Sequence, residues 1–289
     1  MKLKNVLVST KQTAYEFYAE KYEDLREVFS AEEIAFYKNK HTEHYDSLNH
    51  IRKTLEFYSI PYQRVYMPYG TFPEFKDRDL IIAIGGDGTV LKSAHYVLDN
   101  TPILSVKSES RSVGALCVID SSEFKVALEK ILGDNFKTED WTRAEGKVSN
   151  SKPDLALNDI LVGPKFRPGA ARYEVSFKDK KEVHMGSGLV VSTGAGSTGW
   201  YINIAGSEGT FDRTAKELRF IATEYTTGKE YQLIKGKILP DEVLNVKSLM
   251  TIDGIVSYDG DKQKRMTDFN VGQSIQIKIS DKPISAIVF

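Results

Sequence analysis

An apolar run that ends in a glycine-rich turn restricts the fold of this chain more than any other feature. Residues 80–84 read Leu-Ile-Ile-Ala-Ile, and residues 85–89 read Gly-Gly-Asp-Gly-Thr. An uninterrupted apolar run is typical of a strand that is buried on both faces of a parallel sheet. The residues that follow, 89–98, favour a helix. A buried strand that passes through a tight turn into a helix indicates a sheet domain of the α/β class.

The turn itself has the composition of a phosphate-binding site. Its glycines let the backbone approach a ligand without interference from a Cβ atom, and the N–H groups at a helix N-terminus suit phosphate oxygens. Asp87 repels phosphate, so it is a candidate base for an attacking hydroxyl or a partner of Mg²⁺. The alternative interpretation is structural, with Asp87 capping the helix. The candidate phosphate and ATP contacts are Gly85, Gly86, Gly88, Thr89 and Lys92.

The remainder of the first half alternates between strands and helices. Leu48, Ile51, Leu55 and Tyr58 fall at helical spacing. The expected helices cover 15–40, 41–58 and a segment from Ser121 or Ser122 to Ile131, and the expected strands include 1–10, 62–67 and 102–106. This alternation predicts an α/β domain over residues 1–140.

The pattern changes near Trp141. From there, runs of Thr, Val, Ile and Tyr alternate with Gly, Asp, Asn and Pro, which is typical of strands joined by turns. The expected strands include 172–177, 188–193, 248–258 and 274–279, with hairpin turns at 179–181 and 259–261. The second half is therefore predicted to be predominantly β.

The composition excludes several classes of function. The 289 residues carry a net charge of −1, so no global field attracts nucleic acid or anionic lipid. Cys117 is the only cysteine, which leaves neither an intrachain disulfide nor a Cys-based zinc site. No stretch approaches the about 18 to 20 apolar residues of a membrane span. These features favour a cytoplasmic protein with neither a nucleic acid nor a membrane as partner. His41, His44 and His50 are interpreted as surface residues, since no further metal ligands accompany them.

The string Gly-Gly-Asp-Gly-Thr resembles the signature of a kinase superfamily. That superfamily includes NAD kinases, diacylglycerol and sphingosine-type lipid kinases and, with Ser in place of Thr, phosphofructokinases. Lipid kinases commonly continue the motif with Asn-Glu, whereas this chain continues with residues 90–92, Val-Leu-Lys. NAD kinases carry an Asn-Glu pair later, and Asn158-Asp159 occupies that place here, with Asp in place of Glu. The arrangement resembles that of the NAD kinase family.

A second glycine-rich stretch, residues 185–200, supports the same resemblance. Residues 194–199 formally match the dinucleotide fingerprint G-x-G-x-x-G, but that fingerprint belongs in a βαβ unit and this copy lies in the β-rich half. The stretch is similar instead to the second NAD kinase signature. The resemblance implies that Thr198 and Gly199 contact the NAD adenine, with Trp200 as the aromatic residue of the loop and Asn203 one turn on. Ser187 stands where the family usually has Asp, and Ala115 lies in a segment where the family places an aromatic residue near the adenine.

The resemblance, which is to a divergent branch that includes bacterial-type and animal mitochondrial NAD kinases, implies both a fold and an activity. The fold is a Rossmann-like domain with a mostly parallel sheet over residues 1–140, a sandwich-like NAD-binding domain over 141–264, and a C-terminal segment, residues 265–289, that rejoins the first domain. The activity is transfer of the γ-phosphate of ATP to the 2′-hydroxyl of the adenosine ribose of NAD, which gives NADP. Asp87 is the expected catalytic residue, and Mg²⁺ or another divalent cation is expected with ATP. The expected NAD-binding residues are Asn158, Asp159, Ser187, Thr198, Gly199, Trp200 and Asn203.

Three alternatives stay open on the sequence. The first is a lipid or other small-molecule kinase of the same superfamily, and the second is a non-catalytic dinucleotide-binding regulator. A dehydrogenase is the third, although no motif supports hydride transfer. The resemblance also implies a homodimer or homotetramer. It leaves open the choice between NAD and NADH as acceptor and between ATP and polyphosphate as donor.

Overall fold

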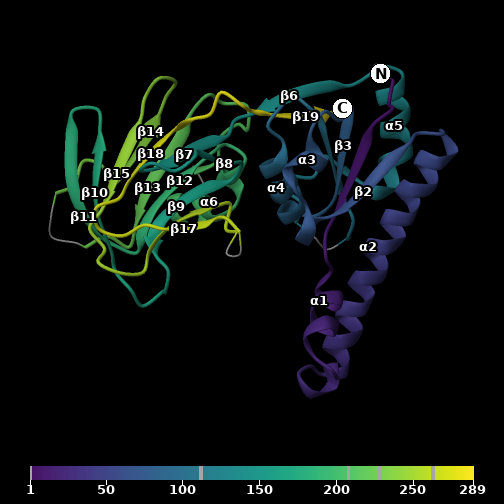
Figure 1. The fold of residues 1–289 in the computed structure, drawn as a ribbon, viewed down its shortest axis with the longest axis horizontal. Coiled ribbons are helices and arrows are strands. Elements are labelled where there is room, and N and C mark those ends of the chain that lie inside the picture. The colour runs from purple at the N-terminus through teal and green to yellow at the C-terminus, as the bar shows by residue number, and fades with distance from the viewer. Residues whose placement is uncertain (1, 111–112, 207–208, 227–229, 262–263) are drawn as a thin grey trace. The chain divides into compact units, whose positions relative to one another are not determined.

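The computed structural model describes residues 2–110, 113–206, 209–226, 230–261 and 264–289 (Figure 1). Two compact units make up the chain. The first comprises Met1–Glu139 together with Ser285–Phe289, and the second comprises Asp140–Ile284. Among the described residues, no helix is long and apolar enough to cross a membrane.

A seven-stranded sheet forms the centre of the first unit. Its order is β2 (Tyr62–Tyr66), β1 (Val6–Thr10), β3 (Leu80–Gly85), β4 (Ile103–Lys107), β19 (Ile284–Val288) and β6 (Lys137–Trp141), and β5 (Ile119–Asp120) pairs with β4 off this path. The pairs among β1 to β5, and the pair of β4 with β19, are parallel. All six residues of β3 are buried, as an apolar run inside a parallel sheet requires.

Helices cover both faces of this sheet. Two of them, α2 (Ala31–Phe57) and α5 (Phe124–Leu132), pack Leu48, Ile51 and Leu128 against alternate strand residues such as Val8 and Ile82. On the other face lies α4 (Asp87–Tyr96), and the hydroxyls of Ser9 and Ser93 meet there at 2.6 Å. The short α3 (Phe72–Phe75) stacks on the same helix through Phe75 and Tyr96. Figure 1 shows the two pairs of helices on opposite sides of the sheet.

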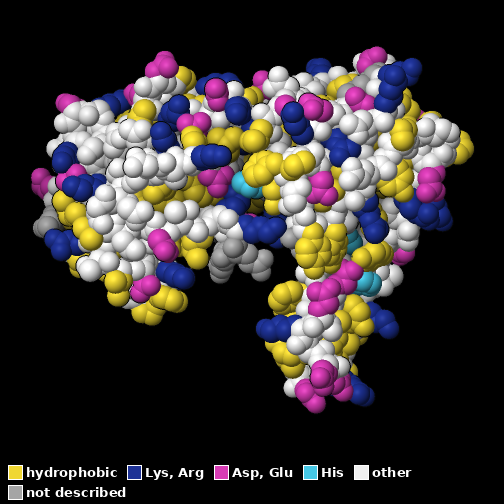
Figure 2. Space-filling view, viewed as in Figure 1, with side chains coloured by type: hydrophobic (Ala, Val, Ile, Leu, Met, Phe, Trp, Pro, Cys, Tyr) yellow, Lys and Arg dark blue, Asp and Glu magenta, His cyan; other side chains and the backbone are white. Residues whose placement is uncertain are grey.

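The boundary predicted between two helices at residues 40 and 41 is wrong. The chain instead forms α1 (Ala14–Lys21), the 3₁₀ turn η1 (Leu25–Glu27) and then α2 without interruption from Ala31. The cause is a capping box, in which Ser30 accepts from the N–H of Glu33 while the Glu33 carboxylate accepts from the N–H of Ser30. The rings of Tyr18 in α1, Phe29 just before α2 and Tyr37 in α2 pack together, and Figure 2 shows hydrophobic side chains on this helical pair.

The second unit is a sandwich of two six-stranded sheets. One has the order β11 (Lys180–Gly186), β10 (Ala171–Phe177), β15 (Leu244–Ser248), β18 (Ser274–Ile279), β7 (Ala144–Val148) and β8 (Asp154–Ala156). The other has the order β14 (Lys235–Ile238), β13 (Leu218–Thr223), β12 (Gly188–Ser192), β9 (Asp159–Pro164), β16 (Gly254–Tyr258) and β17 (Met266–Asp268). Alternate residues of both sheets, among them Tyr173, Val175, Leu189 and Val191, form one core. An α/β unit and a β-sandwich unit confirm the predicted fold class.

Two details differ from the sequence prediction. The single strand predicted over 248–258 is wrong, because the chain turns at residues 249–253 and passes from β15 in one sheet to β16 in the other. The segment that rejoins the first unit is also shorter than residues 265–289. Residues of β17 and β18 pair inside the sandwich, because their alternation fits its two half-buried sheets, and only β19 joins the first sheet.

Candidate active site

Asp87 lies at the end of β3, as the first residue of α4, with Gly86 at the N-cap position. Its carboxylate accepts two backbone hydrogen bonds, from the N–H of Leu116 at 2.8 Å and from the N–H of Ala115 at 3.2 Å. Asp87 therefore does not cap the helix that it begins. An ionised carboxylate has about four acceptor positions. Two of them hold the side chain in place, and the others remain available.

Some of the residues around Asp87 are buried in the turn and others are exposed to solvent. A Cβ atom on Gly85 would lie 2.1 Å from the Oγ1 atom of Thr89, so only glycine fits there. Thr89 is turned inward, with 4% of its surface exposed and its N–H bonded to the Gly86 carbonyl at 2.9 Å. A Cβ on Gly88 would meet no atom within 4 Å, and Lys92 is exposed. The open side of the turn therefore lies at Gly88, and Thr89 supports the turn from inside.

A buried histidine braces the edge of the sheet next to this turn. His44 is fully buried, which corrects its interpretation as a surface residue. Its Nε2 and Nδ1 atoms lie 2.9 Å from the hydroxyl of Thr10 and 2.8 Å from that of Ser108. The Ser108 N–H in turn donates to the Gly85 carbonyl at 3.0 Å. Burial, followed by the charge of Lys11, lowers the pKa of His44 to about 4. A neutral histidine thus ties two strand ends together behind the Asp87 turn.

In the second unit, Asn158 and Asp159 lie in the tight connection between β8 and β9. The backbone of this connection is held by Asp259, whose carboxylate accepts from the N–H groups of Leu157 at 3.2 Å, Asn158 at 2.6 Å and Asp159 at 3.3 Å. The Asp259 N–H also donates to the Asp159 carbonyl at 2.9 Å. Asp259 follows β16 in a left-handed conformation, with φ of 52°.

Arg265 completes this arrangement. Its guanidinium lies 2.8 Å from Asp259 and 3.0 Å from Asp154, and it also donates to the Leu155 carbonyl. Only 4% of the Arg265 side chain and 3% of the Asp259 side chain are exposed. On the sequence alone, Asp259 is a turn residue and Arg265 carries no signal. The structure shows that together they fix the position of the Asn158 connection.

Asp159 faces the protein interior. Its surface is 5% exposed, and burial, followed by the negative charge of Asp259, raises the pKa of its carboxyl group to about 7. Asn158 is half-buried, and its Nδ2 atom lies 3.4 Å from a carboxylate oxygen of Asp159. Of the pair, Asn158 is the residue with exposed surface.

The second glycine-rich stretch packs directly on Asn158. A Cβ atom on Gly196 would lie 1.9 Å from the Asn158 carbonyl oxygen, and a Cβ on Gly199 would lie 3.2 Å from its Nδ2 atom. The Thr193 hydroxyl donates to the Leu157 carbonyl at 2.5 Å. Glycine is required at residue 196 because the two backbones touch. The stretch continues through the 3₁₀ turn η4 (Gly196–Thr198) into α6 (Trp200–Ala205).

The structure therefore brings Asn158 together with the loop that carries Thr198, Gly199 and Trp200. Thr198 is exposed, and Trp200 at the start of α6 is 41% exposed. Asn203 is also exposed, and its Nδ2 atom lies 3.4 Å from the Gly199 carbonyl. The β12 strand before the loop pairs antiparallel with β9 and β13, so the stretch is not part of a βαβ unit.

Residues 6–136 match the family model of the ATP-NAD kinase N-terminal domain. Over these residues the chain is similar to the NAD kinase family. It is 26% identical over 272 residues to a probable NADH kinase of Oryza sativa subsp. japonica, an alignment that covers 85% of this chain and 81% of the rice protein. It is 33% identical over 146 residues to an NAD kinase of Saccharolobus islandicus, which covers 50% of this chain and 56% of the archaeal protein. The chain therefore spans only about half the length of this relative.

Two solved structures share the fold of this chain. The NAD kinase of Archaeoglobus fulgidus in complex with ATP superposes with a TM-score of 0.70 at 19% identity, over 99% of this chain and 93% of the other. The yeast NADH kinase complexed with NADH gives a TM-score of 0.70 at 16% identity, over 99% of this chain and 84% of the other.

Ser187 lies apart from the other predicted NAD-binding residues. It precedes β12, whereas Thr198 and Trp200 follow the other end of that strand. Its hydroxyl donates to Glu224, which also pairs with Arg167 at 2.9 Å. Five strand residues separate the two ends, a span of about 17 Å at the rise of a β-strand.

Within the described ranges, no group of three or more His, Cys, Asp and Glu side chains is arranged to hold a metal ion. Near the glycine-rich turn, Asp87 is the carboxylate that the sequence singles out. Burial, followed by the negative charge of nearby Asp87, raises the pKa of the Cys117 thiol to about 12. The thiol is thus held in its neutral form.

Proposed function

We propose that this chain is an ATP-dependent kinase that phosphorylates the 2′-hydroxyl of the adenosine ribose of NAD or NADH. The similarity to NAD kinases supports the reaction class. The observation that carries the proposal is the position of Asp87, which two backbone N–H groups hold at the exposed start of α4. In the reaction, a bond forms between the ribose 2′-oxygen and the γ-phosphorus while the bond from that phosphorus to ADP breaks. Asp87 accepts or orients the hydroxyl proton.

The first unit carries the residues that are proposed to bind phosphate. Gly88 offers open backbone next to the half-buried Gly86, and Lys92 offers positive charge on the first turns of α4. Thr89 and Gly85 act beneath them by shaping the turn. This division replaces the expectation that all five residues face phosphate.

The second unit carries the residues that are proposed to bind the nucleoside. The Asn158 amide is proposed to bind ribose hydroxyls, with Asp159 and Asp259 fixing its position. The exposed ring of Trp200 can stack on an adenine, beside the small surface of Thr198 and Gly199, with Asn203 at the border. Ser187 is left out of this proposal because it lies at the other end of β12.

A divalent cation is proposed to arrive with ATP. Mg²⁺ in such sites usually keeps several waters and takes one or two carboxylates in addition to substrate phosphates. The residues fit that requirement, since Asp87 is available while the described part of the chain contains no dedicated cluster of metal-ligating side chains. The cation neutralises phosphate charge when it is bound. Homo-oligomerisation and a cytoplasmic location stay predictions.

The direct test is NADP or NADPH formation from NAD or NADH with ATP and Mg²⁺, compared with diacylglycerol and sphingosine as acceptors and with polyphosphate as donor. Asp87→Asn keeps the size of the side chain and should lower turnover by at least ~10²-fold, the low end for loss of a general base. The matched control is Asp241→Asn, an exposed residue of the second unit, which should leave turnover unchanged. Equal turnover of both variants would remove Asp87 from the mechanism. Tight NAD binding without turnover in the unaltered chain would instead identify a non-catalytic dinucleotide-binding protein.

A further inference from the structure

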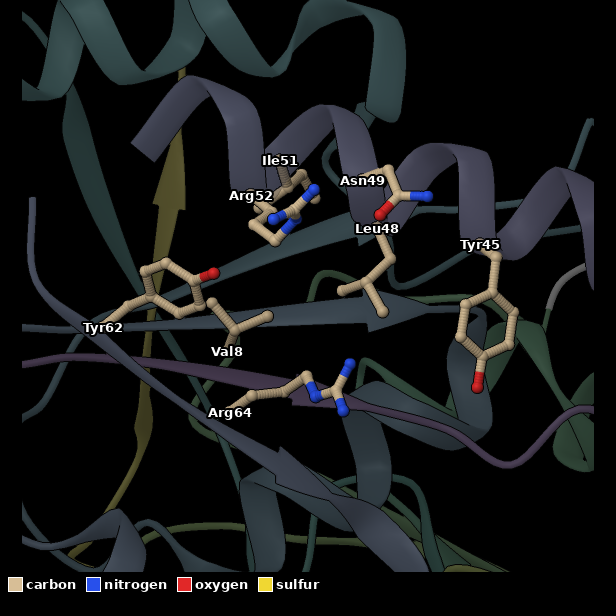
Figure 3. Close-up of a pocket in the computed structure, with 8 residues that line it drawn as sticks. All are labelled: Val8, Tyr45, Leu48, Asn49, Ile51, Arg52, Tyr62 and Arg64. Carbon is tan, nitrogen blue, oxygen red and sulfur yellow. The ribbon is translucent and has the colours of Figure 1, made fainter. Parts of the chain in front are cut away.

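A hollow of about 300 Å³ lies in the first unit between α2 and the edge of the sheet (Figure 3). It is lined by residues of β1, β2 and α2: Val8, Tyr45, Leu48, Asn49, Ile51, Arg52, Tyr62 and Arg64. Val8 and Arg64 are register partners in the middle of their strands. Asp87, in contrast, follows the end of β3. The hollow is therefore separate from the proposed phosphate site.

The floor of the hollow is apolar and its border is polar. Val8, Leu48 and Ile51 are at most 7% exposed, and all three belong to the core beneath α2. Figure 3 shows Tyr45 and Tyr62 at opposite ends, with Val8 and Leu48 between them. The volume is at the lower limit of small-molecule sites, about 300 to 1,000 Å³. A compact apolar body of about this volume suits this floor.

Arg64 gives the hollow its charge. It is exposed on the edge strand β2, and within the described ranges no acceptor lies within hydrogen-bonding or ion-pairing distance of its guanidinium. Arg52 on α2 lines the same hollow and pairs with Glu56 at 3.4 Å, with both side chains about half exposed. The Tyr45 hydroxyl is already committed, since it donates to Glu16 at 2.5 Å. Of the two guanidinium groups that line the hollow, that of Arg64 is thus the one without a carboxylate partner among the described residues.

We infer that this hollow binds a small aromatic anion, with its ring on Val8, Leu48 and Ile51 and its acidic group on Arg64. A guanidinium presents several N–H donors in one plane, which suits a carboxylate, sulfonate or phosphate group. Tyrosine rings at the two ends add offset or edge contacts to an aromatic ligand. The inference depends neither on ATP nor on NAD, so its test is independent of the proposed kinase activity.

The test is calorimetric titration with naphthalene-2-sulfonate in the presence of saturating NAD, so that the nucleotide site is occupied. Naphthalene-2-methanol carries the ring without the charge, sodium sulfate carries the charge without the ring, and decanoate replaces the ring by a chain. The sulfonate should bind saturably with one site per chain and more tightly than each of the other three. Tighter binding of decanoate would overturn the aromatic assignment.

Three variants locate the binding site. Arg64→Gln should weaken sulfonate binding by about tenfold, the factor that one charge-assisted hydrogen bond supplies. Arg172→Gln removes an exposed arginine from the sandwich unit and should bind as the unaltered chain does. Asn49→Trp alters an exposed residue at the border of the hollow and should abolish binding by filling it. The inference is overturned if Arg64→Gln and Arg172→Gln bind equally well, or if Asn49→Trp binds normally.

Discussion

At the scale of single residues, Asp159 is the carboxylate whose surroundings most strongly change its chemistry. Burial and the charge of Asp259 raise its pKa in the folded chain to about 7, against about 3.9 for an unfolded Asp. Because the pKa is higher in the folded chain, protonated Asp159 contributes fully to the free energy of unfolding below about pH 4. This contribution is lost as the pH rises through about 7. Asp159→Asn has no such proton to lose. The free energy of unfolding of Asp159→Asn minus that of the unaltered chain should therefore rise by on the order of 4 kcal/mol between about pH 4 and pH 8.

Urea denaturation at several pH values measures this difference. Asp241→Asn serves as the control, because its exposed side chain should leave the pH dependence of unfolding unchanged. A difference between Asp159→Asn and the unaltered chain that stays constant with pH would show that Asp159 titrates normally.

Prediction of single residues from the sequence was correct where a short motif determines both the type of side chain and the backbone conformation. The Gly-Gly-Asp-Gly-Thr string placed Asp87 at a strand-to-helix turn, and the structure has it there. The same string does not separate Gly88, which is open, from Thr89, which is buried. His44 was misread because its partners, Thr10 and Ser108, are far away in the chain and become neighbours only in the sheet.

At the scale of elements, Arg265 joins three segments through buried ionic contacts. It connects β8, the turn after β16 and the residues before β17, by way of Asp154 and Asp259. Removal of one partner from a buried ion pair costs about 3–5 kcal/mol, because the other charge is left without compensation. Arg265→Met should therefore lower the free energy of unfolding by that amount in urea denaturation. In the double variant with Asp259→Asn, the loss should be smaller than the two single losses together, since no buried charge is left at residue 259.

The control for this prediction is an exposed pair of the same chemistry. Arg167 and Glu224 are in contact at 2.9 Å but are 77% and 59% exposed. Arg167→Met should cost at most about 1 kcal/mol. Similar losses for Arg167→Met and Arg265→Met would mean that the Arg265 contacts do not hold the Asn158 connection in place.

Element prediction followed the strength of the local pattern. Residues 80–84 and 274–279 were predicted as strands and lie in β3 and β18, because a buried run and a strict alternation each indicate a strand clearly. The start of α2 at Ala31 was missed, although Ser30 and Glu33 have the spacing of a capping box. The exchange between sheets at residues 249–253 was missed, although Asp253 precedes Gly254 there and takes a left-handed conformation with φ of 57°.

At the scale of the whole molecule, the chain leaves the first unit after Glu139 and returns to it at Ser285. A return of this kind makes the stability of the first unit depend on residues that are distant in sequence. Ile287 on β19 is fully buried and belongs to the same core as Val106 and Leu128. Its neighbour Phe289 is 46% exposed. The two positions therefore provide a matched pair for testing how much the returning strand contributes.

Ile287→Ala should lower the free energy of unfolding of the first unit by about 2–5 kcal/mol, the usual cost of removing a buried aliphatic side chain. Phe289→Ala should cost much less, because much of that ring already lies in solvent. Hydrogen exchange read by mass spectrometry resolves the units separately. Amide protection should fall in peptides of β4 and α5 but not in those of β12 and β16, since Ile287 packs with the former and the latter have their own core. Equal loss of protection in the sandwich peptides would show that the two units unfold as one cooperative body.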